Sequence, residues 1–322
     1  HNRARAGPER AGYYGLDLYS MQTSIDEVLQ YLAWGDPAAA REARERYACF
    51  DQFGEDQHDY AMAAGADRWA TCEQGAIAQL QHMQQRAADY MRAAGPDAAD
   101  AFFYAQQNAR LVKNAEHYYR TMFRGGVSSW NLRDQHMAET LDALVAHLDT
   151  GQEAPARLVV WEHNSHIGDA RATQVGDVGE LNLGQLVRER YPGQTCLIGF
   201  STYEGWVTAA SRWDGPAKRK RVRPALADSY EDLFHRSGLG DFYLPLTDDS
   251  EARRALLERR LERAIGVLYL PRTERQSHYL YAQLPCQYDA VIHIDHSDAV
   301  RPLDPDQHWH SAEPPETFPA GL

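Results

Sequence analysis

Residues 158–169 read Leu-Val-Val-Trp-Glu-His-Asn-Ser-His-Ile-Gly-Asp, and this stretch says most about the fold. Its apolar beginning, Leu158–Trp161, is typical of a buried strand, so the polar residues after it are expected in a loop at the strand's carboxyl end. Open α/β sheets bind their ligands at that end of the strands. Two imidazoles, an amide and a carboxylate within 163–169 supply acid-base and hydrogen-bonding groups. The stretch therefore predicts a ligand site at a strand end; the alternative is a surface loop whose histidines are only structural.

The second half of the chain alternates apolar runs with helical patterns, and this alternation predicts an α/β sheet with helical cover. The further strand candidates are 196–200, 265–270 and 290–294, and the helix candidates are 183–190, 230–235 and 251–263. One strand candidate, 290–294, alternates apolar and polar residues, so His293 within it is expected to be a hydrogen-bonded core histidine.

The first half is mostly helical in pattern. After a short strand-like entry at 11–18, a helix is predicted to begin at Ser24, with Glu27 completing a capping box. Asp36-Pro37 is expected to start the next helix, with Asp36 as its cap. Breaks are expected at Gly95-Pro96 and Gly125-Gly126, and a long helix over about 132–148.

These patterns predict an α/β fold with a large, mostly helical N-terminal half. We expect one domain over 11–302, in which the helical portion covers about 23–149 and the α/β portion about 155–302. The proline-rich end, 303–322, is expected to be a tail.

Composition excludes several classes of protein. The 322 residues carry a net charge of −13, which disfavours a nucleic-acid partner. The basic cluster 218–223 is expected to be a solvated loop, because no aromatic platform accompanies it. No apolar run reaches membrane-spanning length, so no membrane partner is expected.

The four cysteines are widely spaced along the chain, at Cys49, Cys72, Cys196 and Cys286. This spacing excludes a Cys-x-x-Cys redox pair or zinc knuckle. It favours reduced, mostly buried thiols and hence a cytoplasmic protein.

Several common catalytic signatures are missing. The sequence has no Gly-x-Ser-x-Gly elbow, no phosphate-binding glycine loop and no His-Glu-x-x-His helix. His163 and His166 are three residues apart beside a strand, where positions i and i+3 face opposite sides, so only a bend would bring both onto one metal ion. We therefore expect neither a metal nor a cofactor. Water-mediated hydrolysis remains, in which a neutral histidine accepts a proton from water and a second histidine or an arginine stabilises the oxyanion.

Further motifs, taken together with 161–169, resemble the erythromycin esterase family, hydrolases named for opening macrolide lactones. These motifs are Tyr14–Asp17, Asn108–Arg110 with Ala115–Arg120, Trp130–Asp134, Gly179–Gly184 and Arg275–Tyr279. The resemblance covers residues 11–302. It implies a carboxylic ester hydrolase without an obligatory metal that acts on a small-molecule ester or lactone, with macrolides, and hence antibiotic resistance, as one case. It leaves the oligomeric state open.

The resemblance also suggests the site residues. His163 and His166 are the candidates for water activation and oxyanion stabilisation, with Arg133 as the cationic stabiliser. Supporting or substrate-binding roles fall to Asp17, Asn108, Glu116, Asp134, Asn164 and Asp169. For Asp17 and Glu116 a structural hydrogen bond is the alternative, and for Arg133-Asp134 a helix-start ion pair and cap. His278, in a polar loop, is expected at the rim of the site or in a structural role.

Two departures from the family pattern affect the expected mechanism. The family carries a Gly-Glu-x-x-His-Gly motif whose histidine is the general base, and this sequence lacks that motif; the chain is therefore expected to be N-terminally incomplete. Glu162 stands where a small residue is commoner, and it either raises the pKa of His163 or points to the opposite face. A catalytically inactive or ligand-binding relative is the alternative function.

Overall fold

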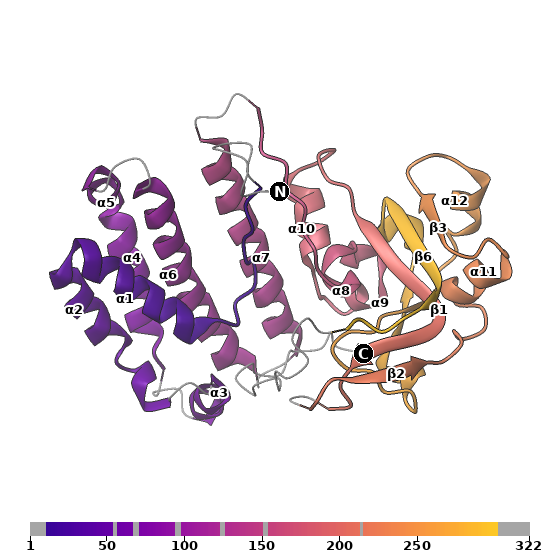
Figure 1. Cartoon of the computed structure of the whole chain (residues 1–322), viewed down its shortest axis with the longest axis horizontal. Coiled ribbons are helices and arrows are strands. Elements are labelled where there is room, and N and C mark those ends of the chain that lie inside the picture. Colours follow the sequence, from indigo (N-terminus) through magenta and orange to yellow (C-terminus); the bar gives the residue numbers. More distant parts are fainter. Residues whose placement is uncertain are drawn as a thin grey trace.

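Packed helices make up the first half of the chain. The computed structural model describes residues 11–53, 57–66, 71–93, 98–122, 126–150, 154–212 and 215–301. The helices of this half are α1 (Met21–Gly35), α2 (Pro37–Tyr47), η3 (Phe50–Phe53), α3 (Gln57–Ala66), α4 (Glu73–Gln85), α5 (Ala87–Ala93), α6 (Ala98–Thr121) and α7 (Gly126–Asp149). α6 packs against α1, α3, α4, α5 and α7, and α7 lies between this bundle and the rest of the molecule (Figure 1).

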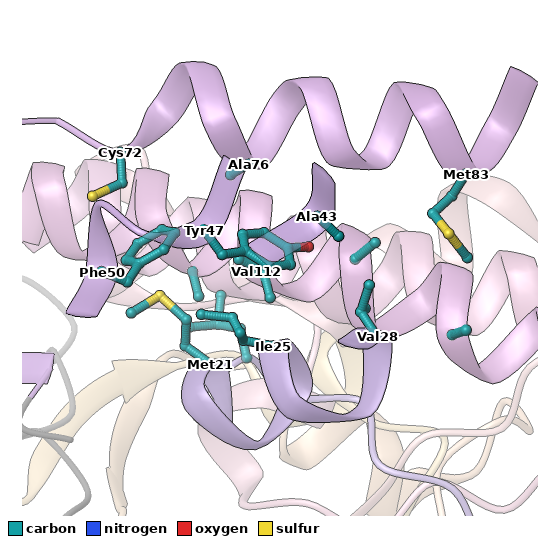
Figure 2. Close-up of a cluster of buried hydrophobic side chains, with 14 of the residues drawn as sticks. Met21, Ile25, Val28, Ala43, Tyr47, Phe50, Cys72, Ala76, Met83 and Val112 are labelled. Carbon is teal, nitrogen blue, oxygen red and sulfur yellow. The ribbon is translucent and has the colours of Figure 1, made fainter. Parts of the chain in front are cut away.

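One apolar core holds the helices of the first half together. Figure 2 shows side chains of α1, α2, α4 and α6 meeting in it, among them Ile25, Tyr47 and Val112. Burying each large apolar side chain of this kind contributes about 1.5–3 kcal/mol. The prediction of a mostly helical first half is confirmed.

The predicted capping box of the first helix is wrong. α1 begins at Met21, and Ser24 lies inside the helix, where its side chain is buried and its hydroxyl has no hydrogen-bond partner among the described residues. Met21, Ile25 and Val28 share one buried face of α1. Because that face begins at Met21, the helix begins before Ser24, and Ser24 is not its cap. Asp36 is a cap as predicted, since its side chain accepts a hydrogen bond from the Ala39 N–H at 3.0 Å.

The second half contains a four-stranded sheet in the order β2-β1-β6-β3. β1 (Ile198–Ala209) and β6 (Ala290–Ser297) pair in parallel at its centre, and β2 (Lys218–Val222) and β3 (Phe242–Pro245) pair antiparallel at the two edges. A separate antiparallel pair consists of β4 (Arg260–Arg263) and β5 (Tyr279–Ala282). The α/β fold is therefore mixed.

Short helices connect and cover these strands (Figure 1). They are α8 (Asn164–Ile167), η5 (Ala170–Ala172), α9 (Gln174–Asp177), α10 (Leu183–Arg190), α11 (Tyr230–Arg236), α12 (Glu251–Ala255), α13 (Glu274–Ser277) and α14 (Leu284–Gln287). The predicted helix 183–190 has the predicted bounds. None of the described helices combines the length and the apolar character needed to cross a bilayer.

Several predicted elements differ from the structure. Leu158–Trp161 belongs to no strand of the described sheets, and the entry 11–18 has no regular secondary structure. The run 265–270 makes only an isolated bridge from Leu268 to Ala210. The predicted helix 251–263 ends at Ala255, and its last residues form β4.

The structure at Gly126 and at the basic cluster 218–223 also differs from the prediction. Gly126 begins α7 instead of ending a helix. The basic cluster forms the edge strand β2, because its residues pair with β1 and Lys220 donates hydrogen bonds to the carbonyls of Ala210 and Tyr269. The predicted break at Gly95-Pro96 and the predicted tail 303–322 lie outside the described residues.

The prediction of four reduced, mostly buried thiols is wrong. Cys49 and Cys72 form a disulfide, with their Cα atoms 5.6 Å apart, and Cys196 and Cys286 are free and exposed. Spacing along the chain did not reveal the pair, because the fold brings residues 23 positions apart together.

Candidate active site

A large open cavity lies between the two halves of the described chain. Its volume is about 1430 Å³. α7 forms one wall, and three segments without regular secondary structure complete it: 11–17, the stretch before α8, and 264–268. The polar residues on its walls include Asp17, Asp100, Arg133, Arg157, Glu162, His163, Ser165, His166, Ser277 and His278.

Two of the sequence motifs bind each other across this region. The Trp130 indole N–H donates to the carbonyl of Leu181 at 2.8 Å, and the Asn131 amide bonds to the Leu181 N–H and the Gly179 carbonyl. Asp134 accepts a hydrogen bond from the Leu183 N–H at 2.8 Å. These bonds hold the first part of α7 against the loop before α10 and so fix the wall of the cavity.

His166 is the most strongly positioned imidazole of the site. Its Nδ1 lies 3.0 and 3.1 Å from the two carboxylate oxygens of Asp134, and its ring stacks on Trp130 with centroids 4.4 Å apart. Burial alone would lower the pKa of His166, but the negative charge and hydrogen bond of Asp134 outweigh it, so that pKa is raised above 6.5. The arrangement favours the protonated imidazole, with Nδ1–H donating to Asp134.

Arg133 supplies a second cation next to His166. It donates to Asp17 in a two-pronged arrangement, Nε to Oδ1 at 3.0 Å and Nη2 to Oδ2 at 2.6 Å, and its guanidinium lies over the Tyr19 ring. Burial would raise the pKa of Asp17, but the charge and hydrogen bonds of Arg133 lower it. Asp17 therefore stays ionised and orients the guanidinium of Arg133, a residue that is 4% exposed.

His163 lines the same cavity in a different arrangement. It is the N-cap of α8, where its Nδ1 accepts a hydrogen bond from the Ser165 N–H at 3.2 Å. Its Nε2 lies 2.9 Å from the carbonyl oxygen of Ile265, to which it donates. Both ring nitrogens are therefore in hydrogen bonds, and the neutral tautomer protonated on Nε2 satisfies both.

The sequence left the direction of the Glu162 side chain open. Its side chain lines the cavity, and its charge interacts with His166, Asp134, Asp17 and Arg133. Burial raises the pKa of Glu162 to about 7, against a smaller opposing effect of His166. The charge of the Glu162 carboxylate therefore interacts with His166. Within the described part of the chain, no hydrogen bond or ion pair joins Glu162 to His163.

Five of the predicted supporting residues do not line this cavity. Asp134 is fully buried behind His166, and the other four have contacts elsewhere. Asn164 bonds to the backbone of Phe200 in β1, and Asp169 pairs with Arg171 and Arg188. Asn108 donates to a backbone carbonyl within α6, and Glu116 accepts from Tyr60 at 2.6 Å and pairs with Arg120. In the structure these contacts hold helices and loops in place.

The remaining histidines of interest have structural contacts. His278 lines the cavity, but its Nε2 accepts the Leu270 N–H at 2.8 Å, so it holds the cavity loop. His293 is fully buried and bonds to Ser201 and Asp295, as expected of a core histidine. Across the described ranges, no group of three or more His, Cys, Asp or Glu side chains is arranged to hold a metal ion. The absence of a metal from the mechanism stays a prediction.

Comparison with known proteins identifies the family. Residues 1–297 match the erythromycin esterase family. The chain belongs to that family. Among solved structures it is similar to a Bacillus cereus protein (TM-score 0.74, 16% identity, covering 92% of this chain and 69% of that one) and to a succinoglycan biosynthesis protein (0.69, 17%, 91% and 66%). It is also similar to a mutant of the erythromycin esterase EreC in its open conformation (0.65, 14%, 90% and 70%). At these identities the likeness shows the fold, and this member of the family spans about two thirds of the length of those chains.

Proposed function

We propose that this family member hydrolyses an ester or lactone in a bulky, largely apolar small molecule. The observation that carries the proposal is His166, a buried imidazole that Asp134 holds against the wall of a large cavity which Arg133 also lines. Such a pair of cations is suited to a reaction in which negative charge develops on an oxygen atom.

The cations would act when water adds to the carbonyl carbon. The carbonyl oxygen then becomes an oxyanion, and protonated His166 and Arg133 supply fixed positive charge on one wall. Because Asp134 and Asp17 already hold the two side chains, little reorganisation accompanies the reaction. Removing one such group from an enzyme costs on the order of 10²–10³ in turnover.

The apolar wall supports a bulky substrate. Along α7, apolar side chains line the cavity beyond Arg133 as far as Leu148, a distance of about 22 Å at 1.5 Å per residue. They are Met137, Leu141, Leu144 and Leu148. A macrolide lactone has this combination of a large apolar body and one reactive carbonyl. The likeness to a succinoglycan biosynthesis protein adds a polysaccharide ester as a second compound to assay.

Activation of the water by a histidine was the prediction from sequence. His163 has both ring nitrogens in hydrogen bonds, and Asp134 favours the charged form of His166. Oxyanion stabilisation is thus the role that the geometry of His166 supports best.

The proposed partner is a small molecule alone. The net charge of −13 disfavours nucleic acid. A cytoplasmic location was predicted from reduced thiols, and the Cys49–Cys72 disulfide removes that support because disulfides persist mainly in oxidising compartments.

The test is an activity assay with simple esters, a macrolide and an acylated polysaccharide, using the wild type, His166→Ala and Asp134→Asn. We expect wild-type turnover on at least one compound, and a loss on the order of 10²–10³ in His166→Ala. Asp134→Asn should lower the pKa of His166, because burial remains while the opposing charge is gone. The alkaline limit of activity should then move to lower pH, and NMR titration of the His166 ring should show the same shift.

Asp26→Asn, an exposed change on α1, is the matched control and should leave both measurements unchanged. Wild-type protein without turnover on any compound would reject the hydrolase and favour a ligand-binding protein.

A further inference from the structure

A second, much smaller cavity borders α8, the helix that carries His166. Its volume is about 20 Å³, and residues of α8, α9, α14, β4 and β5 line it. Ser165 and Ala264 line both this small cavity and the large one. A cavity needs roughly 10–15 Å³ to hold one water molecule, which also requires polar partners. The volume of the small cavity therefore suits a single water molecule.

Three side chains on the walls of the small cavity form one hydrogen-bond network. The Tyr288 hydroxyl donates to Oε1 of Glu262 at 3.2 Å and accepts the side-chain N–H of Gln287 at 2.9 Å. Two oxygen atoms of the network remain, Oε2 of Glu262 and Oε1 of Gln287, and neither has a hydrogen-bond partner among the described residues. Glu262 and Gln287 are each 4% exposed. Because an unpaired buried oxygen is costly, both atoms are expected to bind a further group.

Two glycines let the backbone approach this network closely. A Cβ atom at Gly168 would lie 2.8 Å from Cγ of Gln287, and a Cβ atom at Gly199 would lie 2.7 Å from the Tyr288 ring. The backbone at these glycines therefore packs directly against the two side chains and restricts their movement. The oxygen atoms that remain are held in place within the protein.

Water fits both protonation states of Glu262. Burial, with a further effect from the charge of Glu231, raises the pKa of Glu262 to about 8, so its carboxyl group carries a proton at neutral pH. Protonated Oε2 can donate to the water, which in turn donates to Oε1 of Gln287. When Glu262 ionises, the same water can donate one hydrogen to each oxygen. A divalent cation would instead require about six oxygen ligands.

We propose that the small cavity binds one water molecule between Glu262 and Gln287, and that this water stabilises α8 and the turn after it. The proposal does not depend on ester hydrolysis. The network contacts this segment at both ends: the Tyr288 hydroxyl lies 3.4 Å from the carbonyl oxygen of Asn164, and the Gln287 carbonyl accepts the Asp169 N–H at 3.0 Å. By completing the hydrogen bonds of Gln287, the water holds the residue on which the Asp169 N–H depends.

A high-resolution crystal structure of the full chain tests the binding directly. We expect one density peak at about 2.5–3.0 Å from both Oε2 of Glu262 and Oε1 of Gln287. Crystals soaked in rubidium chloride should give no anomalous signal at this position, because water does not exchange for a monovalent cation. A structure without the peak, or with a rubidium signal in its place, would overturn the proposal.

Gln287→Met tests the effect on the segment, because it removes the acceptor and keeps a side chain of similar length. The folded variant should lack the density peak, and its Asp169 amide hydrogen should exchange with solvent faster than that of the wild type. Gln276→Met is the matched control, the same change at an exposed position of α13, and it should keep the peak and the wild-type exchange rate.

Glu262→Gln is a second variant, and it should retain the peak because an amide still bonds to water. Melting curves show whether each variant is folded, and the wild-type crystal structure decides the binding if Gln287→Met does not fold. A peak that persists in folded Gln287→Met would overturn the assignment of the water to Gln287. An unchanged exchange rate at Asp169 in that variant would overturn the stabilising role.

Discussion

At the scale of single residues, a second buried glutamate makes stability depend on pH. Glu262 lies in β4 and is 4% exposed; its Oε1 accepts a hydrogen bond from Tyr288, and its Oε2 has no partner within the described residues. Burial, with a further effect from the charge of Glu231, raises the pKa of Glu262 to about 8. The folded state therefore holds a proton that the unfolded chain, with a pKa of 4.5 for this group, has released at neutral pH.

The sign of this linkage leads to a prediction for Glu262→Gln. The folded pKa is raised, so the contribution of Glu262 to stability is fully present below pH 4.5 and is lost as the pH rises to about 8. An amide cannot ionise, so the variant should be more stable than the wild type at high pH. The difference should be small near pH 4 and grow by up to about 1.4 kcal/mol per pH unit before levelling off. Urea unfolding from pH 4 to about 9 measures it.

Glu258→Gln, an exposed change in the same region, should follow the wild type at every pH. A difference between Glu262→Gln and wild type that does not vary with pH would show that Glu262 is ionised in the folded protein.

The sequence named several residues of the site but not their contacts. The family resemblance, together with the dense polar stretch 163–169, suggested Asp17, Arg133, His163 and His166, and all four line the cavity. The direction of Glu162 was not predictable, because it depends on where the extended segment bends into α8. The pairing of Asp134 with His166 joins residues that are 32 positions apart, and only the fold brings them together.

At the scale of elements, the sequence predicted those features that depend on residues close together in the chain. The cap at Asp36 and the bounds of α10 follow from residues close in the chain, and both predictions are confirmed. Strands depend on partners far away in the sequence. Leu158–Trp161 has the composition of a strand and no strand partner in the described sheets, whereas basic β2 has the opposite composition and pairs with β1.

The disulfide is an element-scale constraint that can be tested directly. It links Cys49, just before η3, to Cys72 at the start of α4, and so closes a loop of the helical half. The two cysteines are 23 positions apart. Closing a loop of that length stabilises the folded state by about 3 kcal/mol, mainly by restricting the unfolded chain. We expect the double variant Cys49→Ala, Cys72→Ala to unfold at lower denaturant concentration than the wild type, by roughly that free energy.

Reductant should destabilise the wild type and leave the double variant unchanged. Changing the exposed Cys196 and Cys286 to Ser is the matched control and should not alter the transition. Equal unfolding midpoints for oxidised and fully reduced wild type would contradict a structural role for the bond.

At the scale of the whole molecule, the described chain has two large apolar cores joined by a smaller one. The first core lies within α1–α6, and the second lies around α11, β5 and β6. Between them, Met137, Ala138 and Leu141 of α7 pack against Leu183 and Leu186 of α10. The site depends on this junction, because Arg133 and Asp134 come from the helical half and His166 comes from the other.

Leu186→Ala should therefore separate the two halves more readily than it unfolds either of them. Truncating a buried leucine costs about 2–5 kcal/mol, and here the loss falls on the junction, at a side chain that does not itself line the cavity. Calorimetry should show the unfolding of the variant as two transitions, and ester hydrolysis should be lost at the lower one. Leu32→Ala, in the core of the helical half, should instead lower the transition of that half. A single transition in Leu186→Ala, shifted as a whole and with activity retained up to it, would mean that the two halves unfold as one unit and that the junction is not the weakest contact.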